Sequence, residues 1–209
     1  GRDDAGGLGR RSDTGDVRPG MGLDSSSPVA KKSGKQSQKL RETVFQVPYE
    51  PASDLSNMGT LVPRNMATAV NRAMDDLEKR HGDIDTYVAD QLGYPVEQLG
   101  DYFAAEQVDA LALAISNISE GSGFIIGDQT GIGKGRVNAG IIRWAKRQGY
   151  IPVFITMKPD LYADMVRDLS DIGMEGFNPL PTNTGLSGKG AILLPDGRTL
   201  KTGGKGPHE

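Results

Sequence analysis

The 209-residue sequence contains no cysteine, and its only two histidines, His81 and His208, lie far apart along the chain. The absence of thiols excludes a disulfide framework and any metal site built from thiolates. A zinc site made of histidines is not expected from two such distant residues. The polar N-terminus carries no visible signal peptide. A reducing compartment, the cytoplasm, is therefore the expected location.

Long apolar runs and a strong excess of one charge are also missing. No segment approaches the roughly 18 consecutive apolar residues that a membrane-spanning helix needs. The formal net charge is −3, from 24 basic and 27 acidic residues. A chain of this charge does not wrap nucleic acid as a polycation, so any such contact has to come from a local patch. We expect no association with membranes.

Large apolar side chains are nearly absent from residues 1–43, which are rich in Gly, Ser, Asp, Lys and Arg. Such a stretch buries too little apolar surface to offset the entropy of ordering, so it is predicted to be a disordered polar and basic linker. We interpret its basic run, 31–41, as part of this solvated linker; a contact with nucleic acid is the alternative. Because the chain opens with Gly1 and ends in "KTGGKGPHE", we expect a segment of a longer polypeptide.

Apolar periodicity predicts the ordered elements. Residues 44–104 are expected to form an extended segment followed by helices: one over 65–80, a short one that Asp83 caps and Gly93 ends, and another from Pro95. The elements predicted for residues 105–176 are helices over 105–118, 134–148 and 159–172, with buried strands over 123–127 and 151–156. This order is typical of an α/β domain with a parallel sheet and right-handed crossovers.

Two further expectations concern the helix over 134–148 and the end of the chain. Three basic residues of that helix, Arg143, Lys146 and Arg147, are expected to form a solvated face. Residues 177–209 are expected to be a Gly-rich loop with a hairpin over 191–201, since Pro195-Asp196-Gly197 supplies turn chemistry between two apolar arms.

A glycine-rich loop, "GDQTGIGKGR" (127–136), follows the first predicted strand. Gly131 and Gly133 let the backbone approach an anion closely, and the helix that follows presents its positive end to the same point. Lys134 adds a full charge where β- and γ-phosphates would lie. The P-loop pattern G-x-x-x-x-G-K-[ST] is met at Gly133 and Lys134, but Asp128 stands at its first position and Gly135 at its last. We interpret the loop as a phosphate site; the alternative is a strand-to-helix turn with a solvated lysine.

Gly135 leaves the ligands of a magnesium ion open. A Ser or Thr at this position normally places a hydroxyl on Mg²⁺, and glycine has none. Thr130, water molecules and acidic residues outside this segment are the alternatives.

With its surroundings, the loop resembles that of the strawberry-notch-type helicase-like NTPases of superfamily 2, and its Asp-x-x-Gly-x-Gly-Lys form is similar to that of Swi/Snf-type translocases. Further blocks extend the resemblance over roughly residues 46–200: "NMGTLVPRNMA", "RHGDIDTYVADQLGY", "AEQVDALALAI" and "MKPDLYADMVRDLSDIGM". They look like the bacterial and phage branch, which includes phage proteins that fuse a helicase to a DNA methyltransferase, among them defence-against-restriction proteins carried in virions. The resemblance implies that residues 105–176 begin a RecA-like P-loop NTPase domain.

The resemblance also implies ATP with Mg²⁺ and a role for each matching residue. Lys134 is expected to be the catalytic residue on the phosphates, and Gln107 to read the adenine edge, which suits a carboxamide; a first-turn residue facing water is the alternative. Thr156 and Lys158 are expected to contact nucleic-acid phosphates, the alternative being a plain strand end. The expected nucleotide-binding residues are Gln107, Asp128, Gln129, Thr130, Gly131, Ile132, Gly133, Lys134, Gly135 and Arg136.

Two parts of a complete helicase-like enzyme are missing from the sequence. No apolar strand ending in Asp-Glu follows the loop, and there is no second RecA-like lobe with its arginine finger. Phosphoryl transfer depends on all these parts together, so this segment alone is expected to bind nucleotide weakly and to hydrolyse it negligibly.

The expected function is therefore ATP binding within a longer nucleic-acid-dependent helicase or translocase encoded by a phage or mobile element. DNA is the expected partner, with a fused or associated methyltransferase, in the bacterial cytoplasm or packaged in a virion. Two alternatives stay open: another P-loop phosphotransferase, and a non-catalytic virion or interaction protein whose nucleotide site is vestigial.

Overall fold

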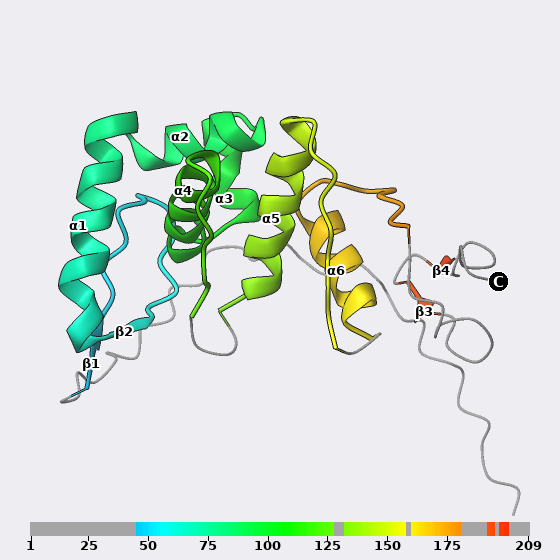
Figure 1. The fold of residues 1–209 in the computed structure, drawn as a ribbon, viewed down its shortest axis with the longest axis horizontal. Coiled ribbons are helices and arrows are strands. Elements are labelled where there is room, and N and C mark those ends of the chain that lie inside the picture. The colour runs from blue at the N-terminus through cyan, green and yellow to red at the C-terminus, as the bar shows by residue number, and fades with distance from the viewer. Residues whose placement is uncertain (1–44, 128–131, 158–159, 181–191, 195–196, 201–209) are drawn as a thin grey trace, which may run out of the picture. The chain divides into compact units, whose positions relative to one another are not determined.

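The computed structural model describes residues 45–127, 132–157, 160–180, 192–194 and 197–200 (Figure 1). All of them belong to one structural unit, residues 37–209. The predicted disordered tail, residues 128–131 of the glycine-rich loop and Lys158 lie outside the described residues.

Helices make up most of the described chain, and the predicted helices are confirmed. They are α1 (Arg64–His81), α2 (Ile84–Leu92), α3 (Leu99–Tyr102), α4 (Ala105–Ser119), α5 (Lys134–Arg147) and α6 (Asp160–Asp171), with a 3₁₀ turn at Val96–Gln98. The predicted ends hold as well: Asp83 accepts a hydrogen bond from the Thr86 backbone N–H at 2.7 Å, and Gly93 ends α2 in the left-handed conformation. None of the helices described combines the length and apolar character that crossing a bilayer requires.

The hydrogen-bonded strands in the described residues form two antiparallel pairs. β1 (Gln46–Pro48) pairs with β2 (Leu61–Pro63). The segment between the two strands is therefore a connection that begins and ends at this pair. β3 (Ile192–Leu193) pairs with β4 (Thr199–Leu200), with Ile192 opposite Leu200, which confirms the hairpin predicted over 191–201.

The predicted parallel sheet is not formed within the described residues. Segments 123–127 and 151–156 run as extended chain (Figure 1), but neither pairs as a strand there. The prediction that both are buried is wrong for one face of each. Phe154 and Ile126 pack against the core, whereas Ile125, Ile151, Val153 and Ile155 are 78–90% exposed. Successive side chains of an extended chain point to opposite sides, and the helices cover only one side.

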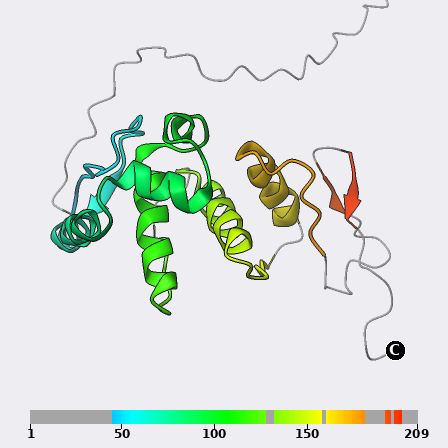
Figure 2. The same cartoon turned by 90° about the horizontal axis from the view of Figure 1, so that it is seen from above.

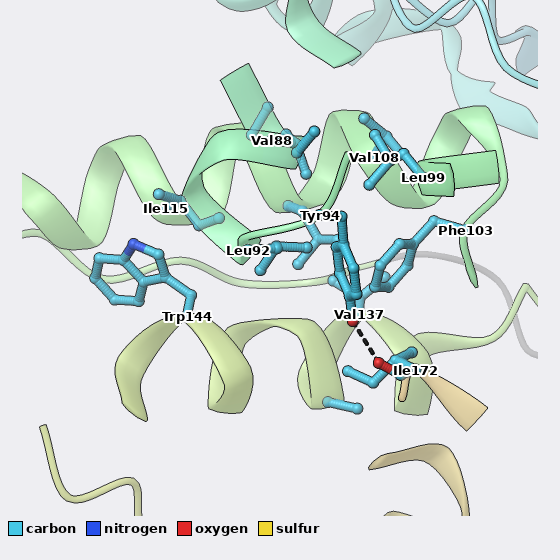
Figure 3. Packing of buried hydrophobic residues seen from close by; sticks show 14 of the residues in the cluster. Val88, Leu92, Tyr94, Leu99, Phe103, Val108, Ile115, Val137, Trp144 and Ile172 are labelled. Atoms are coloured by element: carbon cyan, nitrogen blue, oxygen red, sulfur yellow. Dashed lines mark hydrogen bonds between the residues drawn. The ribbon is translucent and has the colours of Figure 1, made fainter. Parts of the chain in front are cut away.

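Helix α4 is the most buried element and organises the rest. It packs between α1 and α5, with α2 against both α4 and α5, and α6 lies on the other side of α5 (Figures 1 and 2). Its core side chains include Val108, Leu111 and Ile115. Figure 3 shows a link between this core and the residue that follows α6: the Tyr94 hydroxyl donates a hydrogen bond to the Ile172 carbonyl oxygen.

Lys146 and Arg147 are exposed, as the predicted solvated face requires, whereas Arg143 is half-buried. The two arginines also donate hydrogen bonds to the end of α2. Arg143 Nε donates to the Leu92 carbonyl oxygen at 2.7 Å, and Arg147 Nε donates to that of Gln91 at 3.2 Å. The Arg143 guanidinium also lies 4.1 Å from the centre of the Tyr94 ring. The reason is that the last carbonyls of a helix have no intrahelical donor and attract cations.

Carboxylates of α4 hold the extended segment between β1 and β2. Asp109, which is 1% exposed, accepts hydrogen bonds from the Tyr49 hydroxyl at 2.6 Å and from the backbone N–H groups of Ala52 and Ser53 at 2.8 and 3.0 Å. Burial raises the pKa of Asp109, although these three donors oppose the shift. One turn earlier, Glu106 accepts from the backbone of Met58 and Gly59.

We expect Asp109→Asn to lower the free energy of unfolding by about 1–3 kcal/mol, because the amide NH₂ cannot accept from the donors that converge on this position. Urea unfolding followed by Trp144 fluorescence measures the change. Asp75→Asn, at an exposed position of α1, is the matched control. Equal stability of the two variants would show that the carboxylate does not hold the segment.

Candidate functional site

The glycine-rich loop enters α5 through a left-handed glycine. Gly133 has φ 76° and ψ 40° and precedes Lys134, the first residue of the helix. No side chain in the described structure caps α5, and the first amides of a helix have no intrahelical acceptor. Lys134 and these amides therefore lie at the same end of α5, where an anion is bound most favourably.

Gln107 links the start of α4 to this loop. Its Nε2 donates to the Ile132 carbonyl oxygen at 2.9 Å, and its Oε1 accepts from the Ala104 backbone N–H at 3.0 Å. The residue is 7% exposed. A Cβ added at Gly133 would overlap Nε2 of Gln107, so glycine is required there both for its positive φ and for this close approach.

Gly135 lies directly against a carboxylate of α6. A Cβ added at Gly135 would come much closer than 3.0 Å to Oδ2 of Asp168. The Asp168 side chain is 17% exposed, and its Oδ1 accepts from Arg167 Nη2 at 3.4 Å. Burial raises the pKa of Asp168, with the charge of Arg167 acting in the opposite direction. A carboxylate oxygen of α6 thus fills the space that a side chain at position 135 would occupy.

Arg136 ties the first turn of α5 to two neighbours. Its Nη2 pairs with Asp171 Oδ2 at 2.9 Å, and its Nη1 donates to the Tyr102 carbonyl oxygen at 3.2 Å. Asp168 and Asp171, one turn apart on α6, therefore face two successive residues of α5. Among the expected nucleotide-binding residues, Arg136 is thus one whose guanidinium is already bound within the protein.

The other predicted site residues are only partly placed. Asp128, Gln129, Thr130, Gly131 and Lys158 lie outside the described residues. Thr156 is half-buried near the end of the extended segment 151–157. The predicted residues that the structure describes, apart from Thr156, are Gln107 and the consecutive residues 132–136, and the hydrogen bond from Gln107 to Ile132 joins the two.

Sequence reasoning missed Asp168. Its only signal was an acidic residue among the polar positions of a predicted helix, and nothing in the spacing shows that this residue meets a glycine 33 positions earlier. Within the described residues, no group of three or more histidine, aspartate or glutamate side chains is placed to hold a metal. A single carboxylate beside a phosphate loop nevertheless fits Mg²⁺, which is usually bound by one or two carboxylates together with phosphates and water.

Comparison with known proteins supports the loop assignment. A family model described as "P-loop containing NTP hydrolase pore-1" matches residues 52–189. The protein strawberry notch of Drosophila melanogaster is 37% identical over 91 residues, which cover 40% of this chain and 6% of that protein. The chain therefore spans a small part of the length of this relative. No solved structure matches significantly.

The family match covers more than half of the chain and includes the loop, α5 and α6. It confirms the expected relation to P-loop NTPases, and the partial match to strawberry notch agrees with the expected helicase-like group. The chain belongs to the family of P-loop containing NTP hydrolases called pore-1.

Proposed function

We propose that this chain is the ATP-binding first part of a nucleic-acid-dependent helicase or translocase of superfamily 2. The observation that carries the proposal is the start of α5, where Lys134 follows the left-handed Gly133 in a chain of the P-loop NTP hydrolase family. Loop amides and the Lys134 ammonium group bind the β- and γ-phosphates. Mg²⁺, when bound, supplies further neutralisation of the phosphate charge.

Adenine recognition by Gln107 is compatible with the hydrogen bonds that it already makes. A carboxamide has two acceptor sites on oxygen and two N–H donors. One of each is used, by Ala104 and Ile132, which leaves one acceptor and one donor for the N6 and N7 positions of adenine. In this role Gln107 holds the base while it remains bonded to the phosphate loop.

The extended segments 123–127 and 151–156 are proposed as two strands of a RecA-like parallel sheet. Their exposed side chains, Ile125, Ile151, Val153 and Ile155, are apolar and alternate with packed ones. The segment 151–154 also borders an apolar cavity of about 380 Å³ that Met165, Leu169 and Leu180 help to line. Further strands of the same polypeptide, together with the helices that cover them, would bury this apolar face.

Nucleic acid is proposed to contact the loop that follows segment 151–156, through Thr156 and Lys158. Short polar and basic side chains at the end of a strand bind phosphate oxygens and carry no base specificity. We place the chain in the bacterial and phage branch that the sequence blocks resemble. In that setting it acts on DNA, with a fused or associated methyltransferase, in the host cytoplasm or packaged in a virion.

Lys134→Ala in the intact polypeptide is expected to weaken ATP binding roughly 10- to 100-fold, since a charge-assisted hydrogen bond to a phosphate contributes about 1.5–3 kcal/mol. Isothermal titration with ATP and Mg²⁺ measures the loss. Lys146→Ala, on the exposed side of the same helix, serves as the control. Unchanged binding and an unchanged ATPase rate in Lys134→Ala would instead favour an interaction protein with a vestigial nucleotide site.

Gln107→Ala is expected to remove the preference for ATP over GTP, because the pairing to the adenine edge is lost, and to weaken both nucleotides through the released loop. Competition between the two nucleotides for a fluorescent analogue measures both effects. Gln98→Ala, at an exposed position of the 3₁₀ turn, is the matched control. Equal weakening of ATP and GTP with an unchanged preference would assign Gln107 to loop positioning alone.

A further inference from the structure

The contact between Gly135 and Asp168 brings together a missing side chain and a mostly buried carboxylate. The phosphate site does not otherwise explain either of them. Position 135 follows the phosphate-binding lysine and carries no side chain, and the nearest atom to a Cβ built there is Oδ2 of Asp168. The carboxylate oxygen therefore lies in the space that a serine or threonine side chain at 135 would occupy. Asp168 can occupy this position only because residue 135 has no side chain.

A carboxylate in this position is unfavourable for a bare triphosphate. Asp168 is mostly buried, and like charges at short range repel strongly where water is scarce. Its neighbour Arg167 is half exposed, at 51%, and is shared with Asp164, so it compensates the Asp168 charge only in part. A divalent cation between the acid and the phosphates converts this repulsion into attraction.

We propose that Asp168 of α6 provides the protein's carboxylate for Mg²⁺ at the phosphate loop, in the place of the usual hydroxyl after the lysine. The inference rests on the proposed function, since it requires a nucleotide in the loop. It fits the chemistry of Mg²⁺, which takes one or two carboxylates together with phosphate oxygens and keeps several waters. Asp168 binds the ion directly or through one of these waters.

This role makes a prediction about nucleotide binding that a purely structural role does not. If Asp168 only stabilised the positive end of α5, its loss would lower thermal stability and leave the magnesium response unchanged. If it binds the ion, its loss removes an attraction in the presence of Mg²⁺ and a repulsion in its absence. The affinity for ATP then falls in the presence of Mg²⁺ and rises in its absence.

The test uses Asp168→Asn, which keeps the shape of the side chain, in the intact polypeptide. Titration with ATP is performed in EDTA and at increasing Mg²⁺. We expect the variant to bind ATP more tightly than the wild type in EDTA, and to need about 10- to 100-fold more Mg²⁺ for half of the magnesium-dependent gain in affinity. Asp164→Asn, which removes the other acid paired with Arg167, is the control and should behave as the wild type.

A second pair of variants tests whether a hydroxyl at position 135 can take over the role of the carboxylate at position 168. Gly135→Ser alone is expected to weaken ATP binding, because the new side chain overlaps Asp168. Combining it with Asp168→Ala is expected to restore the magnesium response that Asp168→Ala alone loses. An unchanged magnesium response in Asp168→Asn, with normal ATP binding, would overturn the inference and leave the proposed function intact. Absence of ATP binding in the wild type itself would overturn both.

Discussion

The hydrogen bond from Gln107 to the Ile132 carbonyl oxygen determines how the phosphate loop meets the rest of the molecule. It joins the first turn of the most buried helix to the residue before the left-handed Gly133. The two segments can approach this closely because Gly133 has no side chain to separate them. Since α4 is packed on several sides, this bond fixes the loop, just before Gly133, to a well-packed part of the structure.

The same helix also holds the N-terminal part of the described chain, the segment between β1 and β2. Glu106 and Asp109 receive backbone and hydroxyl donors of the segment between β1 and β2, while Gln107, between them in sequence, faces the loop. Buried carboxylates are unfavourable unless they are hydrogen-bonded, and here each has its donors. Three polar residues in the first turns of α4 thus connect the N-terminal segment, the core and the phosphate site. Because the three residues are close together on one helix, a displacement at one of these contacts also affects the other two.

The helices were predictable from the sequence because each has a periodic apolar face and a recognisable end. Asp83, Gly93 and Gly173 mark such ends by capping or by a positive φ. The loop was predictable from its glycines and lysine. The contacts of Arg143 and Asp168 were not, because they join residues that are distant in sequence and depend on how two helices are placed. The buried strands were predicted from apolar composition alone, which does not show whether both faces are covered.

The uncovered face of residues 151–157 has a consequence for work with this chain in isolation. Ile151, Val153, Ile155 and Met157 present alternate apolar side chains on an extended backbone, the arrangement that recruits a neighbouring molecule by strand addition. We expect the isolated chain to self-associate through this face at the concentrations that crystallisation requires. Polar replacements at these outward positions, rather than changes in the helices, are the rational route to a monodisperse sample.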